Sequence, residues 1–179
     1  MSYRKNLYKL CELFDVIIPK YLSEFLKAKM EGVKNYEHTN AWWEPNEGKL
    51  SRAPPRGAEL VVFRSEGPEK WGMNLLIKVL KYSSFELLTW KGKEWIALGV
   101  LLKTRKGVTA QDATGGIDLE EARSCFIRVR DALGELNILG AISTVNELEE
   151  STYVLFHALA DFASCVFLFV VYRRRHTKL

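Results

Sequence analysis

The sequence predicts an α+β fold, in which an antiparallel sheet of about four strands packs with helices and a long C-terminal oligomerisation helix follows. Stretches with helical periodicity flank short runs of β-branched and aromatic residues, glycine turns separate those runs, and the C-terminal part repeats apolar residues every seven positions. We therefore expect an α+β domain over residues 1–140 and a helical tail with a basic tip over residues 141–179.

The first predicted element is an amphipathic helix over residues 3–31, because its apolar residues recur at spacings of three and four. Pro19 predicts a kink or a restart within this helix. A long loop rich in proline, glycine, asparagine and arginine follows. Loops of this length in compact domains are usually functional or disordered.

The middle of the chain is expected to supply the sheet. ELVVFRS, residues 59–65, predicts a strand, whereas residues 67–83 predict a helix with Pro68 near its start and one apolar stripe. Glycine turns around Gly92 and Gly107 are short enough for hairpins. These turns separate three further predicted strands, which are FELLTW (residues 85–90), KEWIALGVLLKT (residues 93–104) and GVTAQDA (residues 107–113).

Two more helices are expected after the sheet. Asp118 and the acidic residues behind it predict a helix start. Thr144 and Glu147 have the spacing of a capping box, which predicts that the tail helix begins there.

The predicted hairpin places tryptophans and cations together. With Lys91 and Gly92 at its tip, strand alternation puts Trp90, Lys93 and Trp95 on one face, and the opposite face holds only apolar core residues. Lys103 and Arg105 continue the first face, Lys106 follows them, and the long loop adds four residues that could close over it, Trp42, Trp43, Arg52 and Arg56.

This combination is typical of single-stranded nucleic-acid binding. Cations follow the phosphates, while flat rings stack unpaired bases at about 1–3 kcal/mol each, whatever the sequence. The sequence therefore predicts a non-enzymatic binder of single-stranded DNA, and RNA would fit the same chemistry. In the alternative interpretation, Trp90 and Trp95 are core residues under the N-terminal helix, and the protein is a self-assembling scaffold that binds no nucleic acid.

Catalytic and metal chemistry find little support in the sequence. The three histidines have no metal-ligand spacing with the three cysteines, and no nucleophile and base stand in a recognisable pattern. We expect no cofactor and no metal. The cysteines are odd in number and lack a CxxC spacing, which indicates a reducing, cytoplasmic setting.

The tail allows two interpretations. Residues 153–172 are long and apolar enough for a membrane span, and three arginines follow them, although Asp161 would lie near the middle. Such a span would anchor a small domain to a membrane. The heptad spacing instead favours a helix bundle that forms a homo-oligomer, a dimer or a tetramer. The predicted oligomerisation residues are Leu148, Leu155, Leu159, Phe162, Val166 and Phe169.

The order of elements and the segment FELLTWKGKEWIALGVLLKTRKG resemble the ThermoDBP group of archaeal single-stranded DNA-binding proteins over residues 1 to about 140. The resemblance implies sequence-tolerant binding of single-stranded DNA in an aromatic cleft with cations alongside. It implies nothing about the tail, because members of that group assemble by different means.

Overall fold

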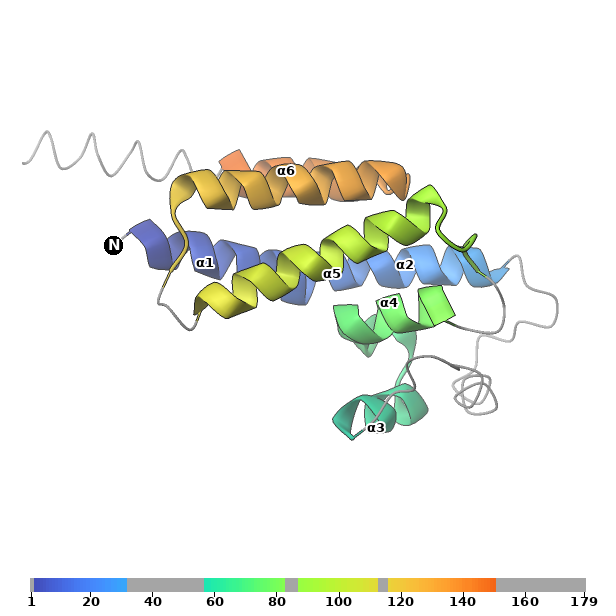
Figure 1. Cartoon of the computed structure of the whole chain (residues 1–179). Coiled ribbons are helices and arrows are strands. Elements are labelled where there is room, and N and C mark those ends of the chain that lie inside the picture. Colours follow the sequence, from blue (N-terminus) through green and yellow to red (C-terminus); the bar gives the residue numbers. More distant parts are fainter. Residues whose placement is uncertain (1, 32–56, 83–86, 113–115, 151–179) are drawn as a thin grey trace, which may run out of the picture.

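The computed structural model describes residues 2–31, 57–82, 87–112 and 116–150. These residues form helices and turns, and none of them lies in a strand (Figure 1). The predicted α+β fold with a four-stranded sheet is therefore wrong, because the described part of the chain is all-helical.

A long helical rod runs through the molecule and consists of α1 (Ser2–Glu12), the π-helical turn η1 (Leu13–Ile17) and α2 (Ile18–Glu31). The Ile18 N–H donates to the Leu13 carbonyl, which lies five residues back. Pro19 has no N–H to donate, and its ring would crowd the carbonyl four residues earlier, so a wider turn just before it relieves the clash. The helix predicted over residues 3–31 is confirmed, with its local distortion beside Pro19.

Shorter elements follow, namely α3 (Ala58–Ser65), the 3-10 turn η4 (Pro68–Lys70) and α4 (Met73–Tyr82). The predicted helix over residues 67–83 is confirmed as η4 and α4, which bury Trp71, Leu76 and Leu80. The strand predicted over residues 59–65 is wrong, because these residues form α3. Phe63 of α3 is buried against Trp71, with ring centroids 5.1 Å apart.

Helix α5 (Lys93–Asp112) takes the place of two predicted strands. Its buried residues Ala97, Leu101, Thr104 and Val108 recur at spacings of four, three and four, which is a helical stripe. Gly107 lies inside this helix instead of in a turn. The expected hairpin tip is the start of the helix, where the Gly92 N–H donates to the Thr89 carbonyl and the Gly92 carbonyl accepts from Ile96, each at 3.0 Å. The remaining expected strand falls partly outside the described residues, and its residues 87–90 form no strand.

Helix α6 (Leu119–Glu135) begins where the sequence predicts. The Asp118 carboxylate caps it by accepting from the Glu121 N–H at 2.8 Å. At the other end, Asn137 has a positive φ of 57°, and the Ile138 N–H donates to the Leu133 carbonyl at 3.0 Å. This bond satisfies a terminal carbonyl and reverses the chain.

Residues 139–150 form a further helical stretch behind α6. The predicted capping box is wrong, because Thr144 lies within this stretch and its hydroxyl is 2.8 Å from the Tyr21 hydroxyl of α2. Ala141, Val145 and Leu148 are buried in the common core, so the core continues past residue 140. Within the described ranges, no helix has the length and apolar character needed to cross a membrane.

The helices pack around one apolar core. Figure 1 shows α5 crossing the rod, with α6 alongside α5 and α4 and α3 on the other side. Helices α5 and α6 form the most extensive contact between two elements. The outer face of α5 is left open to solvent, and this face carries the candidate site.

Candidate nucleic-acid interface

Trp90 and Trp95 are brought together at the beginning of α5. Trp90 lies in the turn before the helix and Trp95 in its first turn, with ring centroids 4.5 Å apart and planes tilted by 56°. Trp90 is 52% exposed, whereas Trp95 is half-buried against the core. The predicted proximity of the two rings is present, although a helix start produces it and not a hairpin.

Lys81 and Tyr82, at the end of α4, complete this aromatic cluster. Tyr82 meets Trp95 edge to face with centroids 5.3 Å apart, and the Lys81 Nζ lies 4.6 Å from the Trp95 ring centroid. The lysine therefore makes a cation–π contact with the indole. Burial lowers the pKa of the Lys81 ammonium below its ordinary value. We call Lys81, Tyr82, Trp90 and Trp95 the aromatic cluster.

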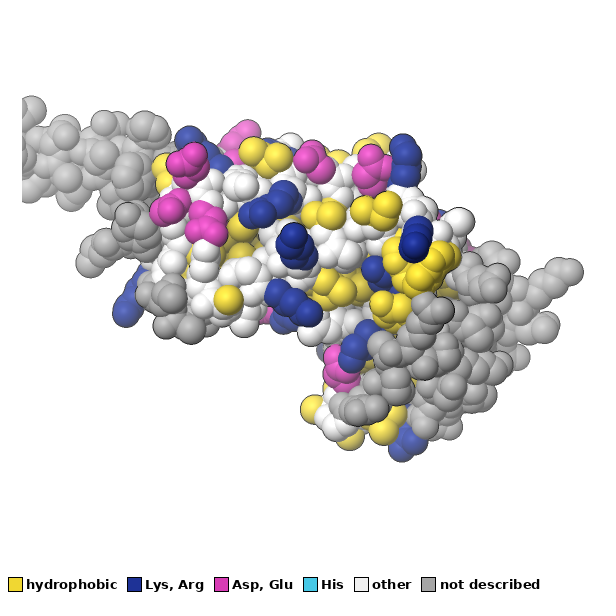
Figure 2. All heavy atoms as spheres, viewed as in Figure 1, with side chains coloured by type: hydrophobic (Ala, Val, Ile, Leu, Met, Phe, Trp, Pro, Cys, Tyr) yellow, Lys and Arg dark blue, Asp and Glu magenta, His cyan; other side chains and the backbone are white. Residues whose placement is uncertain are grey.

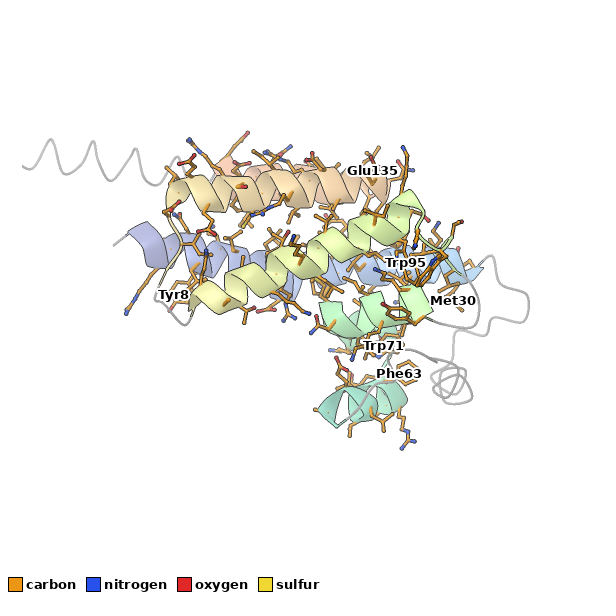
Figure 3. The ribbon with its side chains drawn as sticks, in the orientation of Figure 1. Tyr8, Met30, Phe63, Trp71, Trp95 and Glu135 are labelled. Carbon is orange, nitrogen blue, oxygen red and sulfur yellow. The ribbon has the colours of Figure 1, made fainter. Side chains whose placement is uncertain are left out.

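The position of the cluster is fixed by the ends of several helices. Figure 3 shows Trp95 beside the end of α2, where Met30 lies, and far from Tyr8 on α1. Lys29 of α2 donates to Glu94 of α5 at 2.7 Å, which ties these two ends together. Trp71 and Phe63 lie elsewhere, between α4 and α3.

The predicted cations of α5 point in different directions. At about 100° per residue, Lys103 and Lys106 lie within about 80° of Trp95 around the helix, and both are exposed. Arg105 lies about 80° from Trp95 in the opposite sense around the helix and pairs with Asp15 of η1 at 2.9 Å. Lys93 is 84% exposed and lies 3.6 Å from Glu135 of α6, which is a weak surface pair.

Positive charge is concentrated around the cluster. Residues 81–106 contain six lysines and arginines against two glutamates. Figure 2 shows apolar side chains gathered where α5 begins and basic side chains along α5. This face therefore combines an exposed ring with an excess of cations.

Other predicted site residues lie outside the described residues. They are Trp42, Trp43, Arg52 and Arg56 in the loop, and Leu155, Leu159, Phe162, Val166 and Phe169 in the tail. Leu148 is described, and it is 8% exposed in the core of its own chain.

A groove that the sequence did not predict runs between α5 and α6. It consists of two adjoining hollows of about 500 and 340 Å³, which share Val100 and Arg128. Ile96, Ala97 and Ala132 make much of the first hollow apolar, whereas the second reaches Cys125. Burial raises the pKa of the Cys125 thiol, to which the Arg128 guanidinium donates at 3.4 Å. Small residues at facing positions on α5 and α6 leave this space. The sequence could not predict the groove, because the spacing of small residues does not show which helices face each other.

Among the residues that the structure describes, no group of three or more histidine, cysteine or acidic side chains is placed to hold a metal ion. Comparisons of the chain with protein-family models, curated proteins and solved structures found no match.

Proposed function

We propose that this protein binds single-stranded nucleic acid, without strong sequence preference, through the aromatic cluster and the cations around it. The observation that carries the proposal is Trp90, an indole that is 52% exposed and packs at a tilt of 56° against Trp95, over whose ring Lys81 lies. A base that covers the open face of Trp90 would remove apolar surface from water and gain stacking energy.

Electrostatics supports the same ligand. Lys81 lies over Trp95, Lys91 follows Trp90 within the turn before α5, and Lys93 is the first residue of α5. Lys103 and Lys106 extend the positive charge along the exposed face of α5. Phosphates of a strand that stacks on Trp90 would meet these cations and release counterions.

The proposal does not depend on the resemblance to the ThermoDBP group. The sheet implied by that resemblance is not present in residues 2–31, 57–82, 87–112 and 116–150. DNA is the proposed ligand and RNA a close competitor, because stacking and phosphate contacts serve both. We further propose a cytoplasmic, non-enzymatic homo-oligomer.

The test is a titration of the full-length chain into fluorescently labelled oligo-dT at low salt, followed by anisotropy. Trp90→Ala should weaken binding by about 5- to 150-fold, which corresponds to one lost stacking contact of about 1–3 kcal/mol. Ile127→Ala is the matched control, because Ile127 of α6 is 50% exposed and lies outside the cluster.

Parallel titrations with duplex DNA and with oligo-U would distinguish the ligand classes. The proposal is overturned if the wild-type chain binds none of the single strands, or if Trp90→Ala and Ile127→Ala bind equally well. Stronger binding to oligo-U than to oligo-dT would make RNA the preferred ligand of the same site.

A further inference from the structure

The groove between α5 and α6 has the character of a protein-docking surface. Its lining includes three cations and three carboxylates, which are Lys93, Lys103, Arg128, Glu121, Asp131 and Glu135. Such a balance gives no net attraction for a phosphate backbone. An apolar floor between charged walls instead suits the apolar face of an amphipathic helix, which inserts residues at spacings of three and four.

We propose that this groove binds residues 153–172 of a second copy of this chain. Leu155, Leu159, Phe162, Val166 and Phe169 have the required spacing of four, three, four and three. As a helix, residues 155–172 would be about 26 Å long, and the lining of the groove from Lys93 to Gln111 extends over about 27 Å of α5. The segment and the groove therefore match in length and in apolar character.

The path of the chain just before residue 151 favours the tail of a second copy, and not the chain's own tail, as the occupant of the groove. Arg130 of α6 contacts Asn146 at 3.0 Å and Glu149 at 2.7 Å. It lies about 140–160° around α6 from Cys125 and Ala132, which line the groove. Residues 146–149 are thus on the side of α6 away from the groove. Five Cα–Cα steps join residue 150 to residue 155 and span at most about 18 Å, which only about equals the half-circumference of a helix about 10–12 Å thick and leaves no length to turn into the groove.

Charge suggests the direction of the bound segment. Arg173, Arg174 and Arg175 follow the apolar stripe directly. Asp131 and Glu135 line the groove at the end where α5 begins. A segment that runs parallel to α6 brings the arginines to these carboxylates, and exchange of tails between two copies gives a closed, symmetric dimer.

The first test measures the mass of the full-length chain by sedimentation in detergent-free buffer. The wild type should sediment at twice 20.6 kDa. Ile96→Asp in the groove and Leu159→Asp in the tail should each raise the dimer dissociation constant by on the order of tenfold or more, because an unpaired carboxylate would be buried. Ile127→Asp, with similar exposure outside the groove, should leave the dimer intact.

The second test exchanges charges. Asp131→Lys should raise the dissociation constant, and reversal of Arg173–Arg175 to glutamate in the same chain should restore it. Glu12→Lys on α1 is the control reversal and should have no effect, because Glu12 does not line the groove.

Three results would overturn the proposal. They are a monomeric wild type, a wild type that stays in solution only with detergent, and an oligomer that Leu159→Asp dissociates but Ile96→Asp does not. The last result would mean that the tails bind one another. The proposal is independent of nucleic-acid binding, since a monomeric Ile96→Asp chain should still bind oligo-dT through Trp90.

Discussion

Trp71 and Trp90 differ in burial and in bonding. Trp71 is 1% exposed, its Nε1 donates to the Glu66 carbonyl at 2.9 Å, and its ring packs on Phe63. Trp90 is 52% exposed and contacts Trp95. Trp71 therefore has the environment of a core residue, and Trp90 that of a surface residue.

This difference predicts opposite effects of truncation. Trp71→Ala should lower the free energy of unfolding by about 3–5 kcal/mol, because it leaves a cavity and an unpaired carbonyl. Trp90→Ala should lower it by less than about 1 kcal/mol, as at most surface positions. Urea denaturation followed by circular dichroism measures both changes. Equal, large losses in the two variants would support the scaffold interpretation, in which all tryptophans are structural.

Some residues of the candidate site could be predicted from the sequence alone. Trp90 and Trp95 were predicted to lie together from composition and short spacing, and their rings do so at a helix start. Lys93 was predicted to share their face, but it lies about 160° around α5 from Trp95 and beside Glu135 of α6. Lys81 and Tyr82 were missed because they reach Trp95 only through the packing of α4 against α5. Arg105 was assigned to phosphate binding, but in the structure its guanidinium pairs with Asp15, which is 90 residues away in sequence.

Among the elements, α5 was wrongly predicted as two strands, because its sequence fits both the two-residue period of a strand and the 3.6-residue period of a helix. Residues 95–102, WIALGVLL, are apolar at almost every position, so alternation and helical periodicity both match. Glycines at positions 92 and 107 then suggested turns. By contrast, α6 has a capping aspartate, acidic residues in its first turn and a clear apolar stripe, and it was predicted correctly.

Gly107 offers a test of the corrected element. A Cβ added at Gly107 meets no atom within 4 Å, and glycine costs about 0.5–1 kcal/mol relative to alanine inside a helix. Gly107→Ala should therefore raise the free energy of unfolding by up to about 1 kcal/mol in urea titrations. In a hairpin turn with positive φ the same change would destabilise the protein, so a loss of stability would contradict the helix.

At the scale of the molecule, the helices separate two surfaces. The aromatic cluster opens beside α4 and α2, whereas the groove lies between α5 and α6, so the two surfaces meet on α5, where Lys93 and Lys103 line the groove and also belong to the proposed nucleic-acid surface. Buried residues from all of these helices join one core, which positions both surfaces. Under the two proposals, association would multiply weak nucleic-acid sites on one long strand.

The charge of the α5 face predicts how binding depends on salt. Each phosphate contact removed from a single-stranded complex should reduce the slope of log affinity against log salt by about 0.7. Lys106 is exposed on the same side of α5 as Trp95, so Lys106→Gln should reduce the slope by up to this amount for every oligonucleotide sequence. Lys5→Gln removes the same charge from α1, at the end of the molecule away from the aromatic cluster, and should leave the slope unchanged. Oligo-dT titrations between 50 and 200 mM salt measure both slopes. Equal slopes in the two variants would mean that attraction comes from net charge alone and that the strand does not follow α5.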